Sequence, residues 1–289
     1  TPTHRAGYCA FYGECGPNPD LKAWNVSSQV PCLSNTPARV ATGTLLSLLR
    51  SVCPDLARGD SETTKVCCTY EQLRALQLSV AISGAVLARC PSCARNFASI
   101  YCHNTCSPDQ SLFINVTRVA KPKAEQSMAV VEYQSFYRQR FADEAFASCR
   151  GVRLPATGGF AISTMCGRYG AQFCTPQRWL DFQGDTSNGL APLDIDFQLV
   201  PNGTVAGDGI EPLDARVWRC AEAPSAQEEP CSCQDCAAAC PPLVPPTDPP
   251  PPFRLGEADG VLVICILVFA VLAIVFLVAL LCQRGSKAA

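Results

Sequence analysis

The stretch VLVICILVFAVLAIVFLVALL, residues 261–281, is an unbroken run of apolar residues. As an α-helix it is long enough to cross the roughly 30 Å hydrocarbon core of a bilayer, where only a helix satisfies its own backbone N–H and C=O groups. We therefore predict a transmembrane helix over residues 257–283. Acidic residues precede the run, whereas Arg284 and Lys287 follow it. The positive-inside rule then places the tail, residues 284–289, in the cytoplasm.

Cysteines are concentrated on the other side of this predicted helix. Of the 20 cysteines, all except Cys265 and Cys282 precede the apolar run. The remaining 18 can form nine disulfides in an oxidising compartment. Spacings of the C-x-x-C type in residues 90–93 and 231–240 also suit zinc or a redox pair. The predicted extracytoplasmic location favours structural disulfides over both, so no metal site is predicted.

Three N-x-S/T sequons point to the same compartment. They begin at Asn25, Asn115 and Asn202, and such sequons accept glycans only in the secretory pathway. No signal peptide precedes Thr1, which is typical of a mature chain whose targeting segment has been removed. The end at Ala289 fits a truncation equally well. We expect a single-pass protein of the plasma membrane or an endosomal membrane, with its N-terminal part outside or in the lumen.

The composition excludes several classes of function. The net charge is −2 and no basic run precedes the membrane segment, which argues against a nucleic-acid partner. The two histidines, His4 and His103, lie in no motif of the G-x-S-x-G type. We find no H-E-x-x-H motif, no P-loop and no dinucleotide fingerprint. The sequence therefore predicts a protein that is not an enzyme and needs no cofactor.

The N-terminal half is predicted to be mostly loop and helix. Turn signals dominate residues 9–68, apart from an amphipathic helix around 45–52. A longer helix is expected from about Thr69 to Arg89. Thr69 and Gln72 form a capping box at its start.

Further along, the pattern changes from helical to extended. Pro91 starts a second helix, and aromatic residues predict a third helix over 131–149. Residues 158–164 look extended, and apolar residues alternate with polar ones over 193–199, which is typical of a half-buried strand. The Gly- and Asn-rich stretch 184–189 is too long for a tight hairpin and fits a lid, although many such loops are solvated connections.

One side of the helix that follows Thr69 carries small or polar groups. Gln72, Leu76, Ser79 and Ser83 follow helical spacing, which is the pattern of a helix that walls a cavity with one polar end. The simpler interpretation is that Gln72 only caps the helix and that the serines face water. The residues by themselves favour this simpler interpretation, because cap signatures are common.

A proline-rich segment separates the two parts of the chain. Eight of the twelve residues 241–252 are proline, which favours an extended polyproline II spacer of about 35 Å at ~3.1 Å per residue. The alternative is an unstructured stalk that only clears the lipid surface. We therefore expect a folded ectodomain over residues 1–240 and a linker over 241–256.

Several motifs occur in one order along the chain. They are Tyr12-Gly13-Glu14-Cys15-Gly16, Cys67-Cys68, Arg89-Cys90-Pro91-Ser92-Cys93, Cys106-Ser107-Pro108, Asn188-Gly189-Leu190-Ala191-Pro192 and Cys231-Ser232-Cys233-Gln234-Asp235-Cys236, followed by the proline linker. Together they resemble the N-terminal sterol-binding domain of the Niemann-Pick type C transporter family. The resemblance extends from Cys9 through the membrane helix. Residues 103–106, 113–118 and 186–193 look closer to the intestinal cholesterol-absorption branch than to the lysosomal one.

The resemblance implies a fold and a site. The fold is α+β, disulfide-rich and helix-dominated, with a small mixed sheet, and it encloses cholesterol with the 3-hydroxyl inward. Gln72 is implied to bind that hydroxyl, which reverses the preference for a cap alone. A second polar contact of the lysosomal relative corresponds here to Pro31, which leaves the hydroxyl to Gln72 with water or with Glu14. The implied sterol-binding residues are Gln72, Glu14, Phe11, Leu76, Ser79, Tyr101, Thr105, Trp179, Asn188, Pro192, Leu193 and Ile195.

The resemblance also implies a disulfide pairing that spacing alone does not select. The implied pairs are Cys9–Cys67, Cys15–Cys32, Cys53–Cys102, Cys68–Cys106, Cys90–Cys231, Cys93–Cys149, Cys166–Cys174, Cys220–Cys236 and Cys233–Cys240.

The leading hypothesis is a non-enzymatic domain that captures cholesterol or a related sterol and passes it to the membrane part of a longer transporter. Its expected partners are the sterol, the membrane and that remaining membrane domain. The rival hypothesis is a cysteine-rich receptor ectodomain that binds a protein ligand. A thiol-disulfide oxidoreductase acting through Cys90 and Cys93 ranks last, because it requires free thiols in the native protein.

Overall fold

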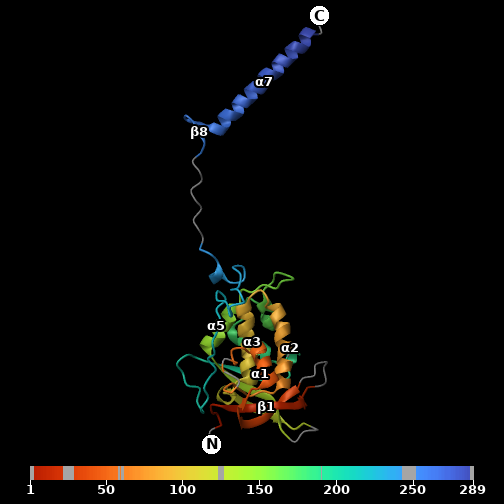
Figure 1. Cartoon of the computed structure of the whole chain (residues 1–289), viewed down its shortest axis with the longest axis vertical. Helices are drawn as coiled ribbons and strands as arrows, with labels where there is room; N and C mark the ends of the chain where they lie inside the picture. Colours follow the sequence, from red (N-terminus) through yellow and green to blue (C-terminus); the bar gives the residue numbers. More distant parts are fainter. Residues whose placement is uncertain are drawn as a thin grey trace. The chain divides into compact units, whose positions relative to one another are not determined.

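The computed structural model in Figure 1 divides into two compact units, Thr1–Pro241 and Pro242–Ala289. Each unit is described separately below. The residues that the structure describes are 3–21, 29–57, 59, 62–122, 127–189, 191–242 and 252–286. The sequon at Asn25 and most of the proline linker lie outside these ranges.

A five-stranded mixed sheet forms the base of the first unit. Its strands are β1 (Tyr8–Pro17), β2 (Gln29–Pro37), β5 (Ile114–Ala120), β6 (Ala129–Arg138) and β7 (Asp194–Val200). The antiparallel order is β1-β2-β6-β5, and β7 pairs with β6 in parallel. Two shorter strands, β3 (Arg39–Val40) and β4 (Lys65–Val66), form a separate pair.

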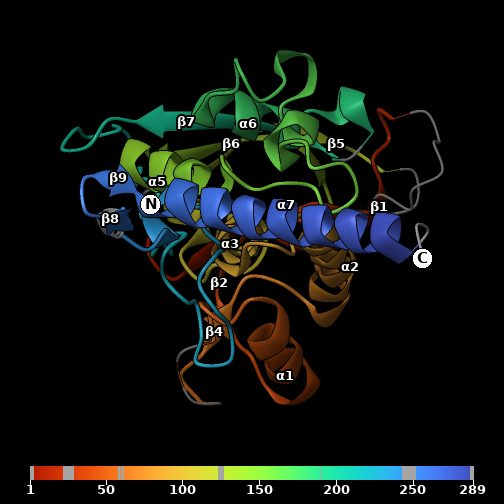
Figure 2. The same ribbon diagram turned by 90° about the horizontal axis from the view of Figure 1, so that it is seen from above.

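Helices cover one side of this sheet, as the positions of α1, α2, α3 and α5 relative to β1 show in Figure 1. Contacts link α1 to α2, α2 to α3, α3 to α5, α5 to α6, and α6 to β7. Figure 2 shows the two ends of this series, α1 and α6, far apart on opposite sides of α3. The helices are α1 (Gly43–Val52), α2 (Tyr70–Val86), α3 (Pro91–Cys106), α4 (Gln110–Phe113), α5 (Gln139–Cys149) and α6 (Pro176–Gly184).

Two main hydrophobic clusters hold these layers together. The first lies between the sheet and helices α3, α5 and α6, and it includes Phe11, Phe97, Tyr133, Trp179 and Leu193. The second joins α1, α2 and α3. Tyr101 on α3 packs against both clusters.

Nine disulfides cross-link the first unit, and they join the pairs that the family resemblance implies. The predicted fold class, a disulfide-rich α+β domain with a small mixed sheet and a membrane helix, is confirmed. The predictions of a capped helix after Thr69, a helix starting at Pro91 and a strand near residues 193–199 are also confirmed.

The prediction of one helix over 131–149 is wrong. Residues Ala129–Arg138 form strand β6, and only Gln139–Cys149 are helical. Along β6 the buried positions alternate, with Tyr133, Ser135 and Tyr137 inside. This period of two belongs to a strand that packs one face on the core. Neighbours β2, β5 and β7 supply its hydrogen bonds, which no local helical signal reveals.

Two other sequence predictions need correction. Residues 9–68 are not mainly loop, because they contain the long paired strands β1 and β2. Their register shifts at several bulges, and Gly13 and Gly16 have positive φ angles there, so the turn signals mark bulged strands. Residues 158–164 are extended only near Phe160, which bridges to Arg153, and a 3-10 helix follows at Ala161–Met165.

The second unit contains a long helix preceded by a small hairpin. Helix α7 (Gly260–Ser286) is the one helix in the described ranges that is long and apolar enough to cross a membrane, over Gly260–Cys282. Strands β8 (Arg254–Leu255) and β9 (Ala258–Asp259) pair immediately before it.

Candidate functional site

Gln72 lies in the first turn of α2 and joins this helix to strand β1. Its Oε1 accepts a hydrogen bond from Thr69 N at 3.0 Å, and Thr69 Oγ1 accepts one from Gln72 N at 3.3 Å. The same Oε1 accepts a second bond from Gly13 N at 3.0 Å. The amide nitrogen Nε2 has no partner among the residues that the structure describes. Gln72 therefore caps the helix with its oxygen and keeps its N–H donors available.

Glu14 and Pro31 lie beside this amide. Glu14 follows Gly13, and it is the register partner of the buried Pro31 in the β1–β2 pair. Burial and the nearby charge of Glu71 raise the pKa of the Glu14 carboxyl above its usual value. Pro31 offers neither a side-chain donor nor a backbone N–H. The structure thus brings Gln72, Glu14 and Pro31 together where β1 meets α2.

The large apolar residues of the predicted site are in the first hydrophobic cluster. Phe11, Trp179 and Leu193 are 3%, 0% and 5% exposed and belong to the same cluster. Tyr101 and Ile195 pack against it. These five residues come from β1, α3, α6 and β7 and the segment before it, so the fold gathers them from positions far apart in the sequence.

Leu76 lies in the second cluster, one helical turn after Gln72 and in contact with the leucines of α1. Tyr101 is the predicted site residue that packs against both clusters. Its hydroxyl donates to Gln183 Oε1 at 2.9 Å, and Gln183 Nε2 donates to Met165 O at 3.2 Å. Burial raises the pKa of the Tyr101 hydroxyl. The neutral, hydrogen-bonded side chain of Tyr101 therefore lies between the cluster that contains Leu76 and the cluster that contains Trp179.

Gln183 is a site residue that sequence reasoning missed. It is 7% exposed, near the end of α6, and it satisfies the one polar group of Tyr101. A single glutamine in a short helix gives no signal of burial, so only the packing of α6 against α3 identifies it. By contrast, the buried Nε1 of Trp179 has no hydrogen-bond partner among the described residues.

The segment before β7 is attached at several points. Asp194 Oδ1 accepts bonds from Thr186 N at 3.1 Å and from Thr186 Oγ1 at 2.7 Å. Asn18, at the end of β1, donates from Nδ2 to Pro192 O at 2.9 Å. Thr186, within the predicted lid 184–189, is therefore tied to the start of β7, and Pro192 is tied to the end of β1.

Three predicted site residues lie outside the buried clusters. Ser79 is exposed, and its carbonyl accepts a bond from Ser83 Oγ at 3.1 Å within α2. Asn188 donates from Nδ2 to a backbone carbonyl of α6. The carbonyl of Thr105 accepts a bond from Gln110 Nε2 at 3.3 Å. These hydrogen bonds join each of the three residues to a neighbouring part of the chain, and none of them involves Gln72 or Tyr101.

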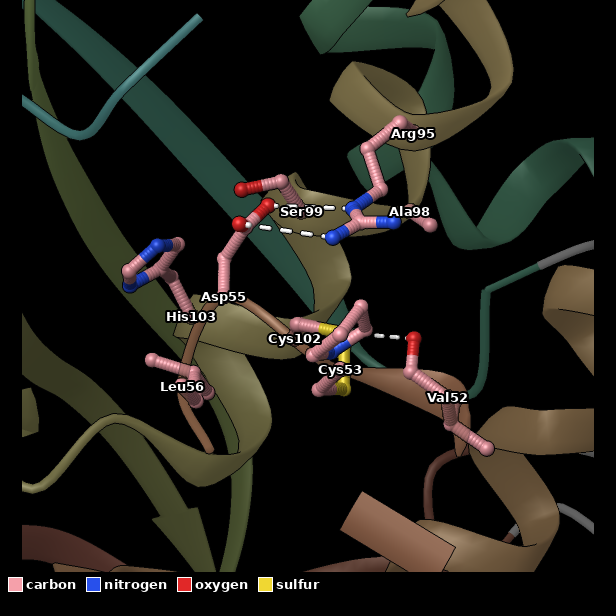
Figure 3. Close-up of a pocket in the computed structure, with 10 residues that line it drawn as sticks. Val52, Cys53, Asp55, Leu56, Arg95, Ala98, Ser99, Cys102 and His103 are labelled. Atoms are coloured by element: carbon pink, nitrogen blue, oxygen red, sulfur yellow. Dashed lines mark hydrogen bonds and ion pairs between the residues drawn. A yellow bond between two sulfur atoms is a disulfide. The ribbon is translucent and has the colours of Figure 1, made fainter. Parts of the chain in front are cut away.

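Two pockets in the described part of the chain lie away from the predicted site. One is about 10 Å³ and adjoins the Cys53–Cys102 disulfide, where Asp55 and Arg95 face each other and form an ion pair at 3.2 Å (Figure 3). The other is about 300 Å³ and lies between the end of α3 and residues 211–214. No predicted sterol-binding residue lines either pocket.

The sequons remain predictions. Asn115 lies on β5, where its Nδ2 donates to Gln134 Oε1 at 3.1 Å. Asn202 is exposed in a turn, and its Oδ1 accepts a bond from Arg140 N at 3.2 Å. Asn25 is outside the described residues. Within the described ranges, no group of His, Cys, Asp and Glu side chains is arranged to hold a metal ion.

Sequence comparison places this chain among known proteins. The profile of the Niemann-Pick C1 N terminus matches residues 6–260. The chain belongs to this family. Among its relatives is the mouse NPC1-like intracellular cholesterol transporter 1, which is 51% identical over 99% of this chain. The human protein of that name is 51% identical over 95% of the chain, and the pig NPC intracellular cholesterol transporter 1 is 32% identical over 89%.

These relatives are much longer than the sequence in hand. The chain spans 22%, 20% and 19% of the mouse, human and pig proteins respectively. The higher identity to the NPC1-like proteins agrees with the expectation that this chain is closer to that branch. The relatives are named as transporters, and α7 is suited to cross a bilayer, so the chain is a membrane-anchored N-terminal part of a sterol-transporter family member.

Proposed function

We propose that residues 1–240 form a cholesterol-binding, non-enzymatic domain of an intestinal-type sterol-uptake transporter. The domain captures sterol outside the cell or in a lumen and passes it to the membrane part of the longer protein. The names of the relatives support this proposal, because they describe cholesterol transporters. This chain spans about a fifth of these relatives, and the membrane domain with which we expect it to work would belong to the remainder of a longer protein.

The observation that carries the proposal is the hydrogen bonding of Gln72. Two backbone N–H groups occupy its amide oxygen, and the amide nitrogen has no hydrogen-bond partner among the described residues. A sterol is a rigid hydrocarbon with one hydroxyl, so one or two well-placed polar groups are enough to orient it. The hydroxyl oxygen accepts from Gln72 Nε2, and its proton is donated to Glu14 or to water.

Apolar burial supplies the affinity. Phe11, Tyr101, Trp179 and Leu193 are packed against the protein interior, so a bound sterol must separate side chains that touch in the structure. Separating these side chains loses van der Waals contacts. Removing the apolar surface of the sterol from water offsets this loss by a free energy of roughly 25 cal/mol per Å². Because Tyr101 packs against both hydrophobic clusters, we place the sterol between the α2 side and the α6–β7 side of the domain.

Equilibrium binding to the secreted, oxidised domain of residues 1–240 tests the proposal. Radiolabelled cholesterol is expected to bind saturably. Epicholesterol, with the opposite hydroxyl configuration, is expected to compete 5- to 150-fold more weakly, because a misplaced hydroxyl leaves a buried donor unpaired at a cost of about 1–3 kcal/mol. Circular dichroism and a thiol assay confirm that the domain is folded and oxidised.

A second prediction concerns Pro31, the buried register partner of Glu14. Pro31→Asn adds amide donors at the polar end, and the affinity for cholesterol is expected to rise about fivefold, from one further hydrogen bond of roughly 1 kcal/mol. The same binding assay measures it. Pro37→Asn, at the exposed end of β2, is the matched control and is expected to leave affinity unchanged. Equal effects of the two variants would contradict this placement of the hydroxyl.

One observation favours the alternative, a receptor ectodomain that binds a protein ligand. Leu78 and Ile82 on α2 are 66% and 72% exposed, an arrangement that is typical of a contact surface. Absence of saturable sterol binding by a correctly folded domain would favour the receptor hypothesis over the sterol-binding one. Retained sterol binding by the Leu78→Ser/Ile82→Ser variant would show that the surface and the sterol site are independent.

A further inference from the structure

The chain folds back on itself just before the membrane helix. Strands β8 and β9 pair Arg254 with Asp259 and Leu255 with Ala258, and Gly256 in the turn has a φ of +67°. The residue after the hairpin, Gly260, donates its N–H to Phe253 O at 2.8 Å. Figure 1 shows β8 directly beside the start of α7. The hairpin and the helix therefore form one continuous structure within the second unit.

Two contacts hold the hairpin on the end of α7. Asp259 Oδ1 accepts bonds from Val261 N at 2.9 Å and from Leu262 N at 3.1 Å, which is the geometry of a helix N-cap. The ring of Phe253 packs against Gly260 so closely that a Cβ at that position would lie 2.2 Å from a ring carbon. Only glycine permits this approach, so Gly260 and Phe253 act as a pair.

The hairpin leaves two large apolar side chains uncovered. Phe253 is 53% exposed and Leu255 is 47% exposed. Because the chain reverses direction, and each strand has two residues at about 3.3 Å per residue, both side chains stay within roughly 10 Å of the first turn of α7. The lipid-facing run begins there, at Val261. The interfacial layer of a bilayer is about 5–8 Å thick on each side, so this distance is comparable to its thickness.

We propose that the hairpin Phe253–Gly260 is an interfacial anchor that inserts Phe253 and Leu255 among the lipid headgroups. The turn carries Glu257, and Arg254 and Asp259 are register partners, so charged groups flank the apolar ones as they do in other interfacial segments. Through this anchor the chain would enter the membrane from a hairpin fixed beside the helix rather than from a free helix end. The anchor sets the point from which the ectodomain is tethered, whatever ligand that domain binds.

Depth-dependent quenching in the full chain tests this proposal. The chain with Leu255→Trp is reconstituted into phosphatidylcholine vesicles that carry bromine either near the headgroup or near the bilayer centre. The three native tryptophans are accounted for by subtracting the signal of the unsubstituted chain. We expect the added emission to be quenched more by the shallow bromines than by the deep ones. Phe269→Trp, in the middle of α7, is the matched control and is expected to show the reverse order.

Two outcomes would overturn the proposal. The first is emission from Leu255→Trp that aqueous iodide quenches and neither bromolipid affects, while Phe269→Trp behaves as a buried reporter. The second comes from adding Gly260→Ala, which places a methyl group against the Phe253 ring. This change is expected to abolish the shallow quenching of the Leu255→Trp chain and to leave the Phe269→Trp signal unchanged. Unaltered shallow quenching would show that the contact between hairpin and helix does not position the anchor.

Discussion

Replacing Gln72 by leucine is expected to lower the affinity of the ectodomain for cholesterol by one to two orders of magnitude. The substitution removes the amide donor from the polar end and leaves the sterol hydroxyl without its partner, which costs about 1–3 kcal/mol. It also removes the oxygen that accepts from Thr69 N and Gly13 N, so part of the effect is structural. Equilibrium binding and thermal unfolding of the same samples separate the two contributions.

Gln72→Glu separates the loss of the sterol-binding donor from the loss of the structural acceptor more clearly. A glutamate at this position still completes the capping box and still accepts from Gly13 N, but it has no N–H donor. The substitution is combined with Glu71→Gln, because the negative charges of Glu71 and Glu14 already repel each other and a third carboxylate would add to this repulsion. Weak sterol binding with unchanged unfolding would support the donor role. Gln77→Leu, an exposed position on the same helix, is the control for substitution itself. Full affinity in the Gln72→Glu chain would refute the assignment.

Leu76→Trp tests the apolar side of the same site. Leu76 is 7% exposed and contacts the leucines of α1, so a larger ring overfills this cluster and costs about 1–3 kcal/mol of stability. We expect the domain to stay folded, since nine disulfides restrain it, and to lose sterol binding. Unchanged affinity in both Leu76→Trp and Gln72→Leu would show that the sterol binds elsewhere.

Removing the Asp235 carboxylate is expected to have the largest effect on stability. Its side chain is fully buried, and it accepts bonds from Arg89 Nε at 3.0 Å, Ser232 Oγ at 2.8 Å and Arg153 N at 2.8 Å. Asp235→Ala leaves these donors without a partner and is expected to lower the free energy of unfolding by about 3–5 kcal/mol. Denaturant titration measures the change. Asp143→Ala, at an exposed position on α5, is expected to change it by less than about 0.5 kcal/mol.

The same carboxylate predicts a pH dependence. Burial by itself would raise the pKa of Asp235, but the bonds from Ser232, Arg153 and Arg89 outweigh burial and hold the pKa below its usual value. Its stabilising contribution is therefore complete above the unfolded-state pKa near 3.9 and is lost as the pH falls through the lower folded-state value. The difference in stability between the parent and Asp235→Asn should be constant from neutral pH to about pH 5 and should shrink below about pH 4. A difference that grows on acidification would contradict this account.

Local sequence signals predicted α2 well and β6 poorly. The capping box at Thr69 and Gln72 is complete within one helical turn, so the residues that start α2 also identify it. The aromatic residues of β6 satisfy helical spacing and alternation equally. The choice depends on hydrogen bonds to strands that start up to a hundred residues earlier, or, for β7, later in the chain. The candidate site shows the same division. Gln72 carries a local signal, whereas Gln183 becomes a partner of Tyr101 only when α6 packs against α3.

The sequence by itself determined the long apolar segment suited to cross a membrane and the capping box of α2, because each depends on the composition or spacing of neighbouring residues. The family resemblance added the disulfide pairs. Only the tertiary structure decided that Gln72 shares its oxygen between Thr69 and Gly13, that Tyr101 lies between two clusters, and that Phe253 packs on Gly260. Apart from the Thr69 cap, these arrangements depend on atoms from separate segments meeting within a few ångströms, and packing selects them through distance and burial that no local pattern encodes.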